Sequence, residues 1–194
     1  MEKQQLSYDQ ALEEAVSFHR EGATNDAERL YLELIKKFPD KGDPSNLLGV
    51  LYSQKEEYSL AAQHIENAIK ICSTVSDWYK NLISIYIKMN LGEKALLLAD
   101  QQIELSPDDC EGYKNKSILV CKVNGVDLAI EYLQSLNQNI QSDLDITIQL
   151  SVFYNIKQDW SKSIALVQPI FDEFPNDPES LEILAKSHFG LKEF

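Results

Sequence analysis

One spacing constrains this chain more than any other feature. Small residues recur every 34 positions, at Ala27, Ala61, Ala95, Ala129 and Ser163. Two helices pack about 8–10 Å apart only where the residues at their closest contact are small, so this series indicates a regular series of helix–helix contacts. The chain is therefore expected to repeat one supersecondary unit along its length.

Other positions keep the same step. With repeats starting at Tyr8, Gly42, Ser76, Cys110, Leu144 and Pro178, the eighth position holds Ala15, Gly49, Ile83, Ser117, Ser151 and Ala185. The eleventh position holds Phe18, Tyr52, Tyr86, Val120, Tyr154 and His188, and a proline closes three repeats at Pro39, Pro107 and Pro175. This pattern resembles the tetratricopeptide repeat (TPR), a pair of antiparallel helices with a period of about 34 residues. The resemblance covers nearly the whole chain.

It implies an all-α fold, a right-handed superhelical solenoid of about five TPR hairpins plus one extra helix. The repeats are expected at residues 8–41, 42–75, 76–109, 110–143 and 144–177, with a partial repeat at 178–194, all within a single domain spanning 1–194. One hairpin cannot bury its apolar face alone, so the repeats must stack.

Capping and turn signals place the individual helices. An S-x-x-Q capping box at Ser7 starts the first helix, which ends near Arg20 before Gly22. The others are expected at about 24–38, 44–55, 58–72, 77–89, 92–105, 109–123, 126–136, 143–157, 160–174 and 178–190, with residues 137–142 as a polar connection.

Some positions depart from the pattern. Ile83 puts a bulky side chain in a small position, and Ala99 stands where other repeats carry a large residue, so the two are expected to exchange volume. Pro169 lies inside a predicted helix and should kink it near Ala165. His188 is expected to pack as a core ring, because it occupies the aromatic position.

The end of the chain suggests an incomplete repeat. Residues 190–194 are expected to form an inner turn with Phe194 at its end, and no second helix follows. Leu181, Leu184 and Phe189 should then lose part of their cover. We infer an N-terminal piece of a longer protein; the alternative is a short protein whose last helix is its cap.

Composition narrows the function. The net charge of −13 disfavours binding to nucleic acid or to anionic membrane surfaces. The odd number of cysteines without a CxxC pair indicates reduced thiols. No secretory signal is visible, and no apolar run approaches the ~20 residues of a membrane helix. A cytoplasmic location without membrane insertion is therefore expected.

No catalytic constellation is visible. The three histidines stand in different repeats, and the sequence shows no phosphate loop, metal-ligand spacing or nucleophile elbow. We therefore expect no enzyme activity, cofactor or metal in this segment. An acid recurs at the second position of each repeat, at Asp9, Asp43, Asp77, Glu111, Asp145 and Glu179. We expect these acids to stabilise helix N-termini rather than to bind a metal.

The resemblance also implies a binding surface, because the first helices of TPR arrays line a concave groove that takes up partners. The candidate groove residues are Asn46, Lys80, Asn81, Lys88, Lys114, Asn115, Lys122 and Gln149. A carboxamide can satisfy one peptide unit of an extended ligand, and lysines suit acidic side chains or a free C-terminus. The series Asn81, Asn115 and Gln149 resembles the asparagine ladder of the TPR arm of O-linked N-acetylglucosamine transferases, although Glu13, Leu47 and Ile183 interrupt it in the other repeats.

The sequence thus predicts a scaffold that binds a protein or an extended peptide. One alternative is the N-terminal substrate-recruiting arm of a larger enzyme, such as a bacterial glycosyltransferase or methyltransferase. Another is a scaffold that self-associates through its last helix.

Overall fold

The computed structural model describes residues 7–136 and 138–192, and all regular structure in these residues is helical. Contacts divide the chain into two units, Met1–Leu105 and Ser106–Phe194, which are described separately. The expectation of one domain over the whole chain stays a prediction.

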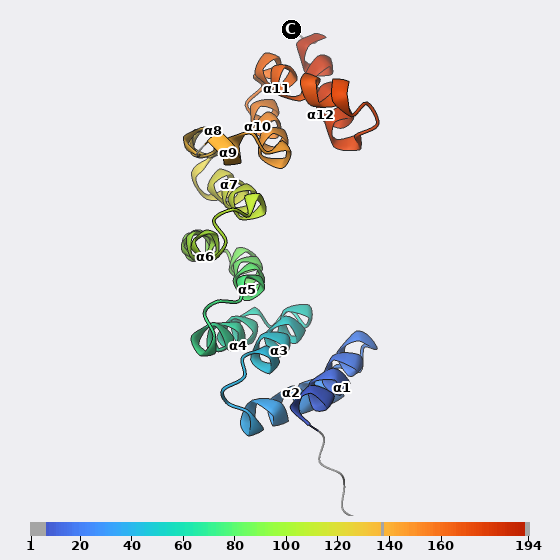
Figure 1. Ribbon diagram of the computed structural model, residues 1–194, viewed down its shortest axis with the longest axis vertical. Coiled ribbons are helices and arrows are strands. Elements are labelled where there is room, and N and C mark those ends of the chain that lie inside the picture. The colour runs from blue at the N-terminus through green and yellow to red at the C-terminus, as the bar shows by residue number, and fades with distance from the viewer. Residues whose placement is uncertain (1–6, 137, 193–194) are drawn as a thin grey trace, which may run out of the picture. The chain divides into compact units, whose positions relative to one another are not determined.

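The first unit consists of three helical hairpins. Its helices are α1 (Tyr8–Arg20), α2 (Thr24–Lys37), α3 (Asp43–Gln54), α4 (Tyr58–Ile71), α5 (Ser76–Lys88) and α6 (Gly92–Leu105). Each first helix packs on its own second helix, and α2 and α4 each pack on the next first helix. The first helices α1, α3 and α5 also contact one another in sequence order, so they form a row (Figure 1).

The hairpins begin and end largely where local signals predict. Ser7 forms the expected capping box with Gln10 at the start of α1. The six recurring acids all lie in the first turn of a helix, where a carboxylate is favourable next to the helix dipole.

Four of the inner turns share one backbone conformation that the sequence pattern does not reveal, whereas the inner turn at Gly125 differs, with φ of 100°. Gly22, Glu56, Asn90 and Gln158 all have positive φ, between 60° and 78°, and they stand at multiples of 34 residues. In each turn the following residue donates its N–H to the carbonyl of the residue at the eleventh, aromatic position, as Glu57 does to Tyr52 at 2.9 Å. This is the pattern of a Schellman motif, which ends a helix at a left-handed residue.

Small residues form the hairpin contacts, as expected. Ala15, Ala27, Ala61 and Ala95 are all fully buried. A Cβ on Gly49 would lie 2.5 Å from Cγ1 of Ile65 and 2.8 Å from the carbonyl oxygen of Ala61, so α3 and α4 meet too closely for a side chain there.

In the next hairpin, formed by α5 and α6, the bulky residue of the contact is on the first helix and the small residue is on the second. Ile83 is the bulky residue of α5, while Ala99 is the small residue of α6 at the register of Ile65. Both are buried, with exposed fractions of 7% and 2%. This is the exchange that the sequence suggests.

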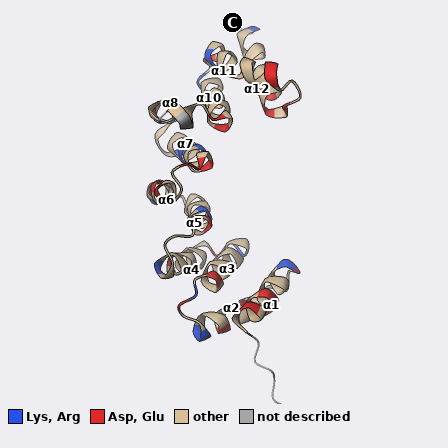
Figure 2. Ribbon diagram, viewed as in Figure 1, with Lys and Arg blue, Asp and Glu red and all other residues tan. Residues whose placement is uncertain are grey.

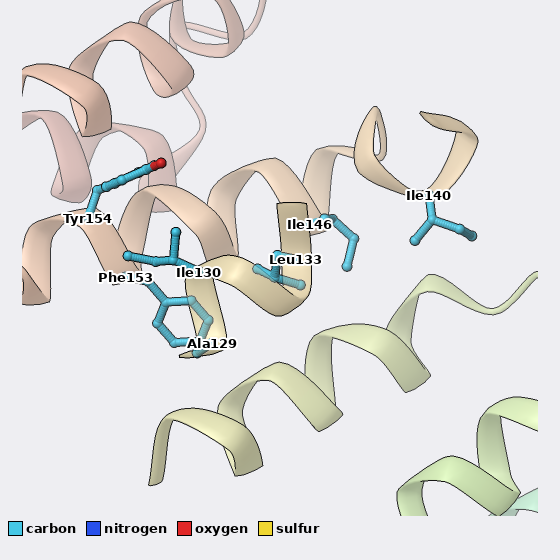
Figure 3. Packing of buried hydrophobic residues seen from close by; sticks show 7 residues of the cluster. All are labelled: Ala129, Ile130, Leu133, Ile140, Ile146, Phe153 and Tyr154. Atoms are coloured by element: carbon cyan, nitrogen blue, oxygen red, sulfur yellow. The ribbon is translucent and has the colours of Figure 1, made fainter. Parts of the chain in front are cut away.

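The second unit consists of α7 (Cys110–Asn124), α8 (Val126–Ser135), α9 (Gln138–Gln141), α10 (Leu144–Ile156), α11 (Trp160–Glu173) and α12 (Pro178–Lys192). The first helices α7, α10 and α12 follow one another, with contacts from α10 to both of the others. One apolar cluster, shown in Figure 3, joins α8, α9 and α10 through Ala129, Ile130, Leu133, Ile140, Ile146, Phe153 and Tyr154.

The short helix α9 corrects one expectation. Residues 137–142 were expected to be an irregular polar connection, but Gln138–Gln141 form one helical turn. Ile140 explains the difference, because its side chain is buried in the cluster and holds the turn against the core. A single apolar residue among Gln, Asn and Ser carries too little periodicity to predict this helix.

Helix α12 differs from expectation at its end. It continues through Gly190 to Lys192, so Gly190–Lys192 are not a turn; Phe194 lies outside the described residues. A Cβ on Gly190 would lie 2.4 Å from the Trp160 ring, so this glycine provides close packing rather than a break. His188 is exposed rather than a packed ring.

Two further expectations concern the last two helices. Leu181 and Phe189 are exposed as expected, whereas Leu184 is buried. Pro169 lies inside α11, as predicted, and the helix continues past it.

Candidate functional site

The candidate groove residues all lie on first helices. Asn46 is on α3 and Lys80, Asn81 and Lys88 are on α5, in the first unit; Lys114, Asn115 and Lys122 on α7 and Gln149 on α10 belong to the second. The continuous ladder from Asn81 to Asn115 would join the two units and stays a prediction.

Within the first unit, two candidate residues meet. The Nδ2 group of Asn81 donates to Oδ1 of Asn46 at 3.0 Å. Asn46 is only 8% exposed, while Asn81 is half-buried. The two amides therefore cross-link neighbouring first helices, and Asn81 is the member with solvent access.

A second polar contact of the same kind joins α1 to α3. Nε2 of His19 lies 3.0 Å from Oε1 of Gln54, and Nδ1 lies 3.2 Å from the hydroxyl of Tyr31. His19 and Gln54 are 35 residues apart, as are Asn46 and Asn81. The sequence analysis did not predict this contact, because it compared positions 34 residues apart. A comparison of positions 35 residues apart pairs His19 with Gln54.

A small cavity opens between α3 and α5. Its volume is about 130 Å³, and its lining residues are Val50, Ser53, Gln54, Asn81, Ser84, Ile85 and Lys88. Asn81 and Lys88 are thus placed together as expected, whereas Ser53, Gln54 and Ser84 were not among the predicted site residues. The Lys88 ammonium also lies 5.3 Å from the centre of the Tyr58 ring, a cation–π contact.

The predicted strip of lysines is accompanied by acids. Lys80 lies 3.7 Å from Asp77, and Lys114 lies 3.7 Å from Asp145 on the next first helix. Figure 2 shows basic and acidic residues beside one another on α5 and α7. The strip therefore carries less net positive charge than the lysines alone suggest.

The remaining candidate residues differ in how far their side chains are exposed to solvent. Gln149 is only 8% exposed, Asn115 is half-buried, and Lys122 is exposed. Gln149 consequently offers a ligand as little surface as Asn46, and less than the half-buried Asn115, a difference that a sequence register does not show.

The chemistry available elsewhere is limited. In the residues that the structure describes, no group of three or more His, Cys, Asp or Glu side chains is placed to hold a metal. Cys72, Cys110 and Cys121 are free thiols. A hydrogen bond with the Thr74 hydroxyl lowers the pKa of Cys72, whereas burial raises those of Cys110 and Cys121. None of the described helices has both the length and the apolar character needed to cross a membrane.

Comparisons with known proteins identify the fold. No family model and no curated protein sequence matches the chain. Solved structures do match, among them a tetratricopeptide repeat protein from Parabacteroides merdae, with 16% identity over 95% of this chain and 73% of that one, and a TM-score of 0.75. YrrB, described as a TPR protein with an unusual peptide-binding site, matches with 17% identity over 91% of each chain and a TM-score of 0.64.

An O-GlcNAc transferase of Thermobaculum terrenum also matches, with 20% identity over 66% of this chain and 26% of that enzyme, and a TM-score of 0.54. At such identities the similarity concerns the fold alone. The chain therefore has the all-α TPR solenoid fold, and the hypothesis that it is an enzyme's recruiting arm stays a prediction.

Proposed function

We propose that the chain is a scaffold whose first-helix faces bind a protein or an extended peptide, without chemistry of its own. The observation that carries the proposal is the cross-linked row of first helices in the first unit, with a small cavity that Asn81 lines. The fold and the peptide-binding site ascribed to YrrB support the same function.

The hydrogen bond between Asn46 and Asn81 suits this role. It uses one N–H of Asn81 and holds the amide in place, which leaves the carbonyl oxygen and a second N–H for a ligand. A peptide unit needs one donor and one acceptor, so Asn81 can satisfy both. Because the amide is already ordered, binding costs less side-chain entropy.

Substitution of the two half-buried asparagines tests the proposal. We expect Asn81→Ala with Asn115→Ala to weaken binding of a peptide selected on an array about tenfold, because two hydrogen bonds of about 0.5–1.5 kcal/mol each are lost. Calorimetry measures the affinity, and circular dichroism should show unchanged helix content. Gln63→Ala with Gln101→Ala, at exposed positions on second helices, is the matched control. Full affinity in the asparagine variant would show that this face does not hold the peptide.

Self-association is a second candidate function, favoured by the surface of α12. Leu181 and Phe189 lie on the same side of α12 with exposed fractions of 53% and 65%, and Leu191, on another side, is 44% exposed; large exposed apolar side chains close together are typical of an interaction surface. If α12 docks on a second copy, light scattering should show a mass that rises with concentration, and Phe189→Asp should abolish the rise. A strict monomer at all concentrations would rule out this function.

A further inference from the structure

The second unit carries two cavities beside the first helices α10 and α12. One, of about 690 Å³, is lined by Leu144, Asp145, Ile148, Ile170, Glu173, Phe174, Pro175, Asn176, Asp177, Pro178 and Glu179. The other, of about 410 Å³, is lined by Val152, Asn155, Ile156, Trp160, Ile183, Lys186, Phe189 and Gly190. Both volumes lie in the range of sites that hold a ligand group.

The two cavities share one face of α10. Asp145, Ile148, Val152 and Ile156 follow one another at steps of three and four residues, which places them in one stripe along the helix. The first two line the larger cavity and the last two line the smaller one. Because α10 packs against α12, which also lines both, the cavities are two ends of a single surface.

The smaller cavity is predominantly apolar. Val152, Ile156, Ile183 and Phe189 line it, and Ile156 and Phe189 keep exposed fractions of 57% and 65%. A large apolar side chain placed here would cover surface that is now in water, at about 25 cal/mol per Å².

The larger cavity is acidic above an apolar floor. Asp145, Glu173, Asp177 and Glu179 supply four carboxylates, and none of the described residues that line it is Lys or Arg. Asp177 accepts hydrogen bonds from the hydroxyl and the backbone N–H of Ser180, and both lower its pKa. Acidic residues on α10 and α12 are visible in Figure 2.

The floor of this cavity fits a long cationic side chain. Ile148 and Ile170 are buried beneath it, and Leu144 and Phe174 are about half exposed at its edge, at 48% and 47%. Lys and Arg side chains lay their methylene stems on apolar surface while the charged group meets carboxylates. Asp145 already pairs with Lys114 at 3.7 Å, so exposed Glu173 and Glu179 are the main partners for an added cation.

We propose that the α10–α12 surface binds an extended peptide that carries a large apolar residue and, about five residues away, a Lys or Arg. The separation follows from the helix: the eleven helical steps from Asp145 to Ile156 span roughly 16 Å, and an extended peptide covers roughly 3.3 Å per residue. The proposal rests on the proposed function. For the second unit it replaces the acidic ligand that the lysines suggest with a ligand that carries a positive charge.

Fluorescence anisotropy with designed peptides tests the charge and the anchor. The probes are fluorescein-labelled Gly/Ser peptides of about twelve residues with Phe and Arg five positions apart, in both orders. We expect one order to bind at least about tenfold more tightly than the same peptide with Arg→Glu or Phe→Gly. Binding should weaken as NaCl rises from about 50 mM to about 500 mM, because exposed charges are then screened.

Two variants with matched controls locate the site. Ile156→Asp and Glu173→Lys should each lower the affinity of the Phe/Arg peptide about five- to tenfold. Leu128→Asp and Glu131→Lys make the same chemical changes at exposed positions on α8 and should leave it unchanged. Glu173 lies in the last turn of α11, where a cation is favourable to the helix dipole, so this variant should fold. Circular dichroism and thermal melting check that it does.

The outcomes separate this inference from the proposed function. A preference for the Arg→Glu peptide, or equal losses in site and control variants, overturns the inference. If the Phe/Arg peptides do not bind while another peptide binds in a manner sensitive to Asn81 and Asn115, the inference is wrong and the proposed function stands. If that other peptide is insensitive to those asparagines while the Phe/Arg peptide binds as described, the proposed asparagine site fails and the α10–α12 site stands.

Discussion

At the residue scale, one group of ionisable side chains bridges α2, α3 and α4. Glu28 accepts hydrogen bonds from the Tyr52 hydroxyl at 2.9 Å and from the Lys55 ammonium at 2.5 Å. The Lys55 bond is the main cause of the lowered pKa of Glu28, whereas burial is the main cause that raises the pKa of Tyr52 to about 12. His64 stacks on Tyr52 with 5.5 Å between ring centres.

We predict that His64 makes stability depend on pH. Burial lowers its pKa below 6.5, against the opposing charge of Glu28, so the folded state disfavours the imidazolium. The contribution of His64 is complete above pH 6.5 and is lost as pH falls through 6.5 toward the lowered pKa. Urea unfolding between about pH 7.5 and about pH 5 should show a smaller loss of unfolding free energy in His64→Gln than in the parent chain.

The matched control is His188→Gln, at an exposed position on α12. It should keep the pH dependence of the parent chain. An identical slope in His64→Gln and the parent chain would contradict the prediction.

We also predict that Gly49 and Ile65 are energetically coupled. Gly49→Ala should cost about 1–3 kcal/mol through overpacking, and Ile65→Ala about 2–5 kcal/mol through a cavity. The double variant should lose less than the sum, because the smaller residue removes the 2.5 Å contact. Unfolding free energies from urea titrations measure the coupling.

A pair in different units provides the comparison. Gly49→Ala with Leu133→Ala should give additive losses, because Leu133 belongs to the cluster of the second unit. Additive losses for Gly49 with Ile65 as well would mean that the close contact does not determine the packing of this hairpin.

At the scale of the element, four of the inner turns use different residues for one conformation. Gly22 adopts positive φ without a side-chain penalty, whereas Glu56, Asn90 and Gln158 carry a side chain there, with φ of 62°, 60° and 64°. A side chain in the left-handed region costs roughly 1–2 kcal/mol, although Asn tolerates it better. These turns therefore hold strain that the local sequence does not relieve.

Replacing a strained residue by glycine should stabilise the fold. We predict that Glu56→Gly raises the free energy of unfolding by about 0.5–1 kcal/mol, because the relief at φ 62° exceeds the added chain entropy of glycine. Thermal and urea unfolding measure the gain. Glu57→Gly is the control, since Glu57 has φ of −84° and glycine therefore relieves no left-handed strain there and should not give this gain. A loss in both variants would show that the turn is not strained.

At the scale of the whole molecule, the acidic residues greatly outnumber the basic ones. The chain carries 31 acidic and 18 basic residues, for a net charge of −13. Such an excess destabilises a folded chain through self-repulsion, and salt screens it. Screening also weakens surface ion pairs, but these contribute little individually.

We therefore predict that salt stabilises the protein. The melting temperature should rise by about 2–5 °C between about 10 mM and about 200 mM KCl, as measured by circular dichroism. Glu131→Lys, which lowers the negative charge by two, should show a smaller rise. A melting temperature that falls with added salt would mean that ion pairs, rather than net charge, control stability.

The sequence by itself determined the helices and their pairing. Caps, glycines and prolines act within a few residues, so Ser7, Gly22 and Pro178 mark helix ends without knowledge of the fold. The step of 34 residues placed Ala27 and Ala61 at hairpin contacts, because every repeat solves the same packing problem.

Only the tertiary structure decided which polar residues meet and which side chains are covered. Asn46 and Asn81 are 35 residues apart and bond because neighbouring first helices are offset by one residue. Ile140 holds α9 against the cluster, and Gly190 remains helical under the Trp160 ring. These outcomes depend on distances between segments far apart in the chain, which local propensity does not encode.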